Sequence, residues 1–177
     1  MVGSVRTARS ARVVSGCGRA PRAGRAPRSG AYPGPVLTIA EGVRNEIVAH
    51  ARRDHPDEAC GIVAGPVGSD SATRFVAMTN AERSPTFFRF DSTEQLKVWR
   101  ELDDLDEVPV VIYHSHTATP AYPSRTDVGL AAEPDAHYVL VSTAECGNSA
   151  GPTEFRSFRI VDGVVTEEEV EVVPHGS

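Results

Sequence analysis

The chain has 177 residues, of which 40% are apolar, a size and composition typical of one globular domain with a hydrophobic core. No stretch approaches the roughly 20 apolar residues of a membrane-spanning helix, and the N-terminus lacks the apolar region of a secretory signal. The three cysteines form no C-x-x-C pair, which fits a reducing compartment better than a disulfide framework. We therefore expect a cytoplasmic protein.

The charge divides the chain into two parts. Residues 1–34 contain seven arginines and no acidic residue, whereas the remainder has eleven Lys and Arg against 24 Asp and Glu, a net charge of −13. This leader is rich in Ala, Gly, Pro and Ser without apolar periodicity, which predicts disorder. A nucleic-acid-binding arm is less favoured because no aromatic residues alternate with the arginines. A misassigned start codon explains the leader at least as well as a nucleic-acid-binding arm does, and an organelle transit peptide explains it less well. One folded domain is expected over residues 35–177.

The folded part is expected to begin with a helix. Thr38 and Glu41 have capping-box spacing ahead of an apolar face, which predicts a helix over 39–52. His55-Pro56 should end it, because the residue before a proline disfavours helical geometry. The residues of the apolar face are Val43, Ile47 and Ala51.

A strand pair and a second helix follow. The apolar run 60–65 predicts a buried strand, and 74–79 its hairpin partner. Ser92 and Gln95 again have capping-box spacing, so a second helix is expected to start there with its apolar stripe facing the core. The residues of that stripe are Leu96, Val98, Trp99, Leu102 and Leu105.

The second half is expected to be mainly strands. The predicted elements are strands over 108–113 and 138–142, a helix starting near Ser124, and a terminal hairpin of 155–160 and 164 onward around Asp162-Gly163. His137 opens one of these strands and is expected to be a hydrogen-bonded core histidine. Strands with interspersed helices predict an α/β or α+β domain without internal repeats.

The segment with the clearest chemistry follows the strand 108–113. His114-Ser115-His116 is followed, after seven residues, by Ser124-Arg125-Thr126-Asp127. Histidines at i and i+2 of an extended segment point the same way, so both imidazoles can reach one ion. Asp127, on the first turn of a helix, can fold back as a third ligand. Two imidazoles and one carboxylate suit Zn²⁺ and leave a fourth position open for water, as in catalytic zinc sites.

Two further side chains complete the candidate site. Glu58 precedes the buried strand 60–65, where desolvation would raise its pKa and suit a proton acceptor that later protonates a departing amine. Ser124 could donate a hydrogen bond to an oxyanion. Each element alone also has a structural explanation, since Ser124 and Asp127 match a capping box and a lone H-x-H is common. The complete set in this order is far more specific.

This pattern resembles the signature of the JAMM (MPN+) zinc metalloproteases over about residues 36–173. The stretches that resemble the family, in particular its small bacterial branch, are Glu58–Gly65, Phe87–Asp91, Tyr113–Thr119 and Ala121–Asp127. The resemblance implies a curved, mostly antiparallel, cytidine-deaminase-like sheet flanked by helices. It also implies one Zn²⁺ held by His114, His116, Asp127 and a water, with Glu58 as general acid/base and Ser124 as oxyanion stabiliser.

The same resemblance implies a substrate. It is a ubiquitin-like sulfur carrier protein that ends in Gly-Gly and bears L-cysteine on its C-terminal glycine, which hydrolysis would release in cysteine biosynthesis. The carrier tail could lie extended in a narrow groove lined by Phe87, Phe88 and Tyr122, although core packing is the favoured role of these rings. An isopeptidase acting on other ubiquitin-like modifiers, a metal-stabilised binding module without activity, and a homo-oligomer all stay open.

Overall fold

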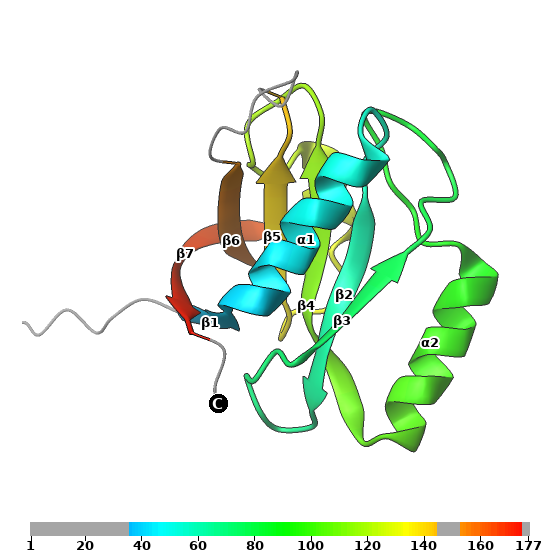
Figure 1. Cartoon of the computed structure of the whole chain (residues 1–177), viewed down its shortest axis with the longest axis vertical. Helices are drawn as coiled ribbons and strands as arrows, with labels where there is room; N and C mark the ends of the chain where they lie inside the picture. Colours follow the sequence, from blue (N-terminus) through cyan, green and yellow to red (C-terminus); the bar gives the residue numbers. More distant parts are fainter. Residues whose placement is uncertain (1–35, 145–152, 175–177) are drawn as a thin grey trace, which may run out of the picture. The chain divides into compact units, whose positions relative to one another are not determined.

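The computed structural model describes residues 36–144 and 153–174 (Figure 1), so the arginine-rich leader expected over 1–34 lies outside the described residues. In chain order the elements are β1 (Val36–Ala40), α1 (Glu41–Asp54), β2 (Cys60–Pro66), β3 (Arg74–Met78), α2 (Ser92–Asp104), β4 (Glu107–His116), α3 (Arg125–Leu130), β5 (His137–Ser142), β6 (Glu154–Val161) and β7 (Val164–Val173). None of the described helices is both long and apolar enough to cross a membrane.

The strands form one sheet in the order β1-β7-β6-β5-β4-β2-β3. Two neighbouring pairs, β1 with β7 and β4 with β5, are parallel and the other four are antiparallel, which confirms the expected mostly antiparallel sheet. The first half of β7 pairs with β6 and its second half with β1, so the sheet curls at this edge (Figure 1). The fold is therefore a mixed, curled sheet with flanking helices.

Alternate residues of the central strands point to opposite faces of the sheet. On β4, Val111 and Tyr113 pack in the hydrophobic cluster that contains the buried face of α1, whereas Ile112 packs in the cluster that contains the buried face of α2. Figure 1 shows α1 crossing one face of the sheet. By this alternation His114 and His116 share the face of Ile112, opposite α1.

The first helix differs from the prediction at its start. Residues 36–40 form β1, paired in parallel with 169–173 of β7, and the helix begins at Glu41. The predicted Thr38 capping box is wrong because Thr38 lies within this strand, and among the described residues no side chain caps α1. The apolar face is buried as expected, and the helix ends at Asp54, ahead of Pro56.

The second helix is capped by Asp91 rather than by Ser92. Asp91 Oδ1 accepts hydrogen bonds from Thr93 N at 3.0 Å and Glu94 N at 2.9 Å, so Ser92 is the first helical residue. The core-facing stripe is also narrower than predicted, because α2 packs on the sheet mainly through β4. Val98 and Leu102 are buried and Trp99 is half-buried, whereas Leu96 and Leu105 are 53% and 55% exposed.

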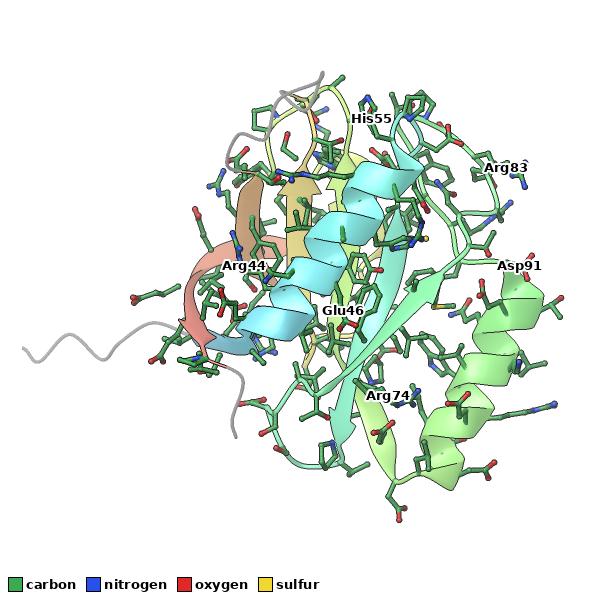
Figure 2. The ribbon with its side chains drawn as sticks, in the orientation of Figure 1. Arg44, Glu46, His55, Arg74, Arg83 and Asp91 are labelled. Carbon is green, nitrogen blue, oxygen red and sulfur yellow. The ribbon has the colours of Figure 1, made fainter. Side chains whose placement is uncertain are left out.

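Arg74 joins α2 to the sheet. Its guanidinium on β3 forms ion pairs with Glu101 of α2 at 3.0 Å and Glu107 of β4 at 2.6 Å. Figure 2 shows this side chain between the strands and the helix. The contact holds α2 beside the end of the sheet where β4 begins.

The later elements agree with the sequence. Ser124 caps α3, and β6 and β7 turn through Asp162 and Gly163, whose φ angles of 50° and 77° suit a two-residue hairpin turn. His137 is a hydrogen-bonded core histidine, as predicted. Its Nδ1 lies 2.7 Å from Glu168 Oε2, and its Nε2 lies 2.9 Å from Arg159 Nη2.

Candidate metal centre and active site

Two imidazoles converge at the end of β4. His114 and His116 are both buried, and their Nε2 atoms lie 3.2 Å apart. His116 Nδ1 donates a hydrogen bond to the carbonyl of Pro120 at 2.9 Å, because a carbonyl can only accept. In the neutral ring this leaves the lone pair on Nε2. The His114 ring stacks on Phe88, with ring centroids 4.4 Å apart.

Asp127 brings a carboxylate to the same point from the first turn of α3. Its Oδ1 lies 3.5 Å from His114 Nε2, and its Oδ2 lies 3.5 Å from His116 Nε2. Oδ2 also accepts a hydrogen bond from Ser124 N at 2.6 Å. Burial alone would raise the pKa of Asp127, but its contacts with both imidazoles and Ser124 outweigh burial and hold the pKa well below its usual range.

The spacing of these three groups fits a tetrahedral zinc site. Two ligands that are each 2.0–2.1 Å from one ion, at the tetrahedral angle, are separated by about 3.3 Å. The Nε2–Nε2 distance of 3.2 Å and the two nitrogen–oxygen distances of 3.5 Å are close to that value. His114, His116 and Asp127 are also the group that geometry alone identifies as able to hold a metal ion among the described residues. The donor set and the spacing therefore both suit Zn²⁺.

The charges at the site favour a cation as well. Burial lowers the pKa of His114, so this imidazole is neutral and available as a ligand. Burial opposes protonation of His116 too, but its contacts with Asp127 and Pro120 outweigh burial and raise its pKa. A bound cation would displace that proton, because a histidine ligand must be deprotonated at the coordinating nitrogen.

Glu58 lies beside this centre in a largely buried position, 5% exposed, just before β2. Burial raises its pKa to about 7; His116 lowers it and Asp127 raises it further. A carboxyl group with a near-neutral pKa can both accept and return a proton at physiological pH. The desolvation expected from the sequence is therefore present.

Ser115 has a structural role that we did not predict. Its side chain points away from the two histidines that flank it, and its Oγ accepts a hydrogen bond from Ala59 N at 2.8 Å. Its own N–H donates to the carbonyl of Ala59 at 2.9 Å. The strand that carries the histidines is thereby joined to the residue that follows Glu58. The two-residue alternation of β4 could have indicated a buried Ser115, although not its partner.

Ser124 caps α3 and keeps a hydroxyl proton to donate. Its Oγ accepts a hydrogen bond from Asp127 N at 3.2 Å, while its backbone N–H donates to the Asp127 carboxylate, forming a capping box. Because the hydroxyl acts here as an acceptor, its O–H bond can point toward another group. The capping role and the predicted oxyanion role are therefore compatible.

A largely apolar groove of about 360 Å³ adjoins the candidate metal centre. Its lining comes mainly from residues 87–90, α2, β4 and α3, and it includes His114 and Asp127. Phe87 and Phe88 line it and are only partly buried, so the core packing favoured from the sequence is not their whole role. Tyr122, the third ring considered for this groove, is not among its lining residues, and its ring lies edge-on to Phe158 with centroids 5.4 Å apart.

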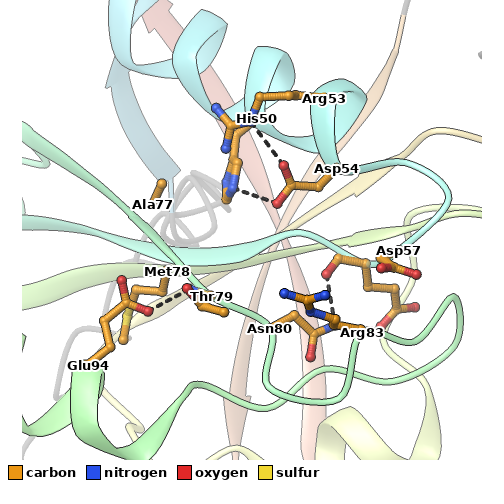
Figure 3. Close-up of a pocket in the computed structure, with 11 residues that line it drawn as sticks. His50, Arg53, Asp54, Asp57, Ala77, Met78, Thr79, Asn80, Arg83 and Glu94 are labelled. Carbon is orange, nitrogen blue, oxygen red and sulfur yellow. Dashed lines mark hydrogen bonds and ion pairs between the residues drawn. The ribbon is translucent and has the colours of Figure 1, made fainter.

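A second cavity of about 390 Å³ adjoins the segment that carries Glu58. Figure 3 shows Asn80 and Arg83 on one side and His50 and Asp54 of α1 on the other. His55 and Arg83 mark the same end of the described domain in Figure 2. Polar side chains make up most of this lining, in contrast to the apolar groove.

The comparisons with known proteins agree with the motif. The family model described as "Prokaryotic homologs of the JAB domain" matches residues 40–161. A "CysO-cysteine peptidase" of Mycobacterium tuberculosis is 70% identical over 138 residues, which cover 78% of this chain and 92% of that protein. A "Probable TtuB-protein conjugate cleaving protease" of Thermus thermophilus is 34% identical over 98 residues, covering 55% of this chain and 64% of that protein.

A solved structure shares the fold. The structure of a protein from Desulfitobacterium hafniense is similar with a TM-score of 0.68 at 32% identity, covering 80% of this chain and 94% of that one. The family model spans well over half of the chain, and the Mycobacterium relative is matched over nearly its whole length. The chain therefore belongs to the prokaryotic JAB-domain homologues, the JAMM-type peptidase family that its motif resembles.

Proposed function

We propose that this protein is a zinc-dependent peptidase that removes L-cysteine from the C-terminal glycine of a CysO-like sulfur carrier protein, as a step of cysteine biosynthesis. The observation that carries the proposal is the 70% identity to a CysO-cysteine peptidase over 92% of that protein. The buried His114, His116 and Asp127 cluster, at zinc-ligand spacing, supports the metal dependence. A metal-stabilised module without activity is less favoured, because Glu58 and Ser124 stand beside that cluster.

Zinc held by His114, His116 and Asp127 would supply a Lewis acid for the scissile carbonyl and for the attacking water. Glu58 takes a proton from that water and delivers it to the departing amine of cysteine. Burial raises the pKa of Glu58 to about 7, which suits both transfers. The Ser124 hydroxyl donates a hydrogen bond to the oxyanion that forms when water adds to the carbonyl.

The apolar groove is the proposed binding site of the carrier's C-terminal tail. His114 and Asp127 are part of its lining, so a tail bound in it would lie with its terminal carbonyl close to the candidate metal centre. A Gly-Gly terminus has no side chains to exclude from the space beside the stacked rings of Phe88 and His114. We place the reaction in the reducing cytoplasm, to which the free thiol of Cys60 is suited.

One relative favours a second candidate function. The Thermus thermophilus protein carries a name that describes cleavage of a protein conjugate. An isopeptidase of that kind would release a lysine side-chain amine instead of free cysteine. A lysine-linked carrier conjugate cleaved with a higher kcat/KM than the cysteine conjugate would favour this alternative.

The test is hydrolysis of a carrier–cysteine conjugate followed by mass spectrometry of the intact carrier. Wild-type protein should remove one cysteine, and both a chelator and Glu58→Gln should abolish the loss. Glu46→Gln, at an exposed carboxylate on α1, is the matched control and should act like wild type. Zinc-loaded wild type that leaves the conjugate intact would overturn the substrate assignment.

A further inference from the structure

Asn80 lies just beyond β3, and its side chain makes four hydrogen bonds. Its Nδ2 donates to the carbonyl of Glu58 at 2.9 Å and to that of Phe87 at 3.1 Å. Its Oδ1 accepts from Glu82 N at 3.0 Å and Arg89 N at 3.3 Å. The side chain is 8% exposed, so these protein groups rather than water satisfy it.

This arrangement uses the full hydrogen-bonding capacity of an amide. Asparagine offers two N–H donors and two oxygen lone pairs, and all four have a partner here. The reverse orientation of the amide would set its oxygen against two carbonyls and its NH₂ group against two N–H groups. The orientation is therefore fixed by its surroundings, and aspartate, serine or alanine could not reproduce it.

The partners of Asn80 belong to two parts of the active site. One is the carbonyl of Glu58 itself, the proposed proton carrier. The others lie in 82–89, the segment that carries Phe88, whose ring stacks on the metal-ligand candidate His114. The same segment contacts Glu58 directly, because Glu58 N donates to the carbonyl of Ser84 at 2.9 Å. Figure 3 shows Asn80 at the border of the polar cavity that Glu58 also lines.

We propose that Asn80 is a positioning residue that fixes the Glu58 backbone relative to the segment that carries the groove-lining rings of Phe87 and Phe88. The inference rests on the proposed function, since it assigns Asn80 a role through Glu58. A proton carrier displaced by about 1 Å can lose roughly a hundredfold in rate, so a fixed main chain at this position matters to catalysis. Ser115 anchors the next residue from β4, so Glu58 is held from both sides.

The test compares Asn80→Asp with Asn80→Ala. Aspartate keeps the acceptor for Glu82 N and Arg89 N, so the loop can still fold, but it loses both donors toward the carbonyls of Glu58 and Phe87. We expect kcat to fall about 10- to 100-fold in Asn80→Asp, with one zinc per chain retained. Ser157→Ala is the control, because Ser157 is also buried but its hydroxyl bonds Glu168 on the neighbouring strand β7. It should lower the melting temperature while leaving kcat per zinc unchanged.

A double-mutant cycle with Glu58→Asp asks whether Asn80 acts through Glu58. Glu58→Asp moves the carboxyl back from the site, so the combined loss in kcat should be smaller than the product of the single losses. The inference would be overturned if the losses in kcat multiply. It would also be overturned if both Asn80 variants keep the wild-type kcat while Glu58→Gln is inactive. An active Glu58→Gln enzyme, or an inactive wild type, would instead overturn the proposed function.

Discussion

The hydroxyl oxygen of Ser115 and the backbone nitrogen of Ala59 are 2.8 Å apart, and this hydrogen bond joins the strand that carries the two candidate histidine ligands to the segment that carries Glu58. Ser115 stands between the two histidines but faces the opposite side of β4, among buried residues. The two imidazoles and the proposed proton carrier are therefore connected through one side chain that need not touch substrate. Its removal tests how far stability and geometry depend on this connection.

Ser115→Ala should destabilise the protein by about 1–3 kcal/mol, because the buried N–H of Ala59 loses its acceptor. Urea unfolding followed by circular dichroism measures the change. Ser69→Ala is the matched control, since Ser69 also accepts a backbone N–H, that of Ser71 at 3.1 Å, but in an exposed turn. A Ser115→Ala protein as stable as the Ser69→Ala protein would contradict this account.

Asp127→Asn should lower zinc affinity by at least tenfold, because the amide removes the one negative charge among the three ligands. Competition with a chromophoric chelator measures the affinity. Asp103→Asn, on the exposed side of α2, should bind zinc like the wild type. Equal affinities in the two variants would remove Asp127 from the ligand set.

Ser124→Ala should lower kcat about 10²- to 10³-fold, the usual loss when one oxyanion donor is removed. The variant also loses the side-chain cap of α3, which costs about 1 kcal/mol of stability. Ser124→Gly separates the effects, because glycine at an N-cap costs only a few tenths of a kcal/mol but has no hydroxyl to donate. Steady-state kinetics should show kcat as low in Ser124→Gly as in Ser124→Ala, and a kcat that follows stability alone would argue against the oxyanion role.

Glu168 should make the free energy of unfolding depend on pH in the acidic range. Burial raises its pKa, but its bonds with His137, Ser157 and Arg159 outweigh burial and hold it below the ordinary value of 4.5. A group whose pKa is depressed by folding stabilises the protein fully above its ordinary pKa and loses that contribution as pH falls through the folded value. The free energy of unfolding should therefore fall steadily below about pH 4.5.

The matched variant is Glu168→Gln. It should be less stable than wild type by about 3 kcal/mol at pH 7, because Arg159 and His137 lose a buried anionic partner. The difference should shrink as the pH is lowered, which urea unfolding at pH 7, 5, 4 and 3 can follow. A constant difference over that range would mean that Glu168 does not contribute through its charge.

Local periodicity and spacing were enough to predict the buried strands, the terminal hairpin and the clustering of the three candidate metal ligands. His114, His116 and Asp127 come together because a strand alternates every two residues and a capped helix starts at a fixed place, and both signals are local. β1 was missed for the opposite reason. Its partner is β7, with Val36 aligned to Glu169, and no pattern near Val36 indicates a strand so distant in sequence.

Asn80 shows where sequence reasoning on one chain stops. Asparagine is common in turns, and nothing near position 80 distinguishes a turn residue from one whose amide contacts Glu58. The same ambiguity led to wrong predictions for the caps of α1 and α2. Thr38 and Ser92 both have capping-box spacing, but Thr38 lies in a strand that pairs with β7, and the neighbouring Asp91 caps α2 instead of Ser92. Roles that depend on several long-range partners appear only when the fold is known.

The capping box of α3 has a thermodynamic consequence. α3 has six residues, too few to be stable as an isolated helix in water. Its cap uses the same Asp127 carboxylate that faces the two imidazoles. Binding of the proposed ion by Asp127 would therefore be linked to the ordering of this helix: each would favour the other, and the affinity for the ion would include the free energy of forming one helical turn.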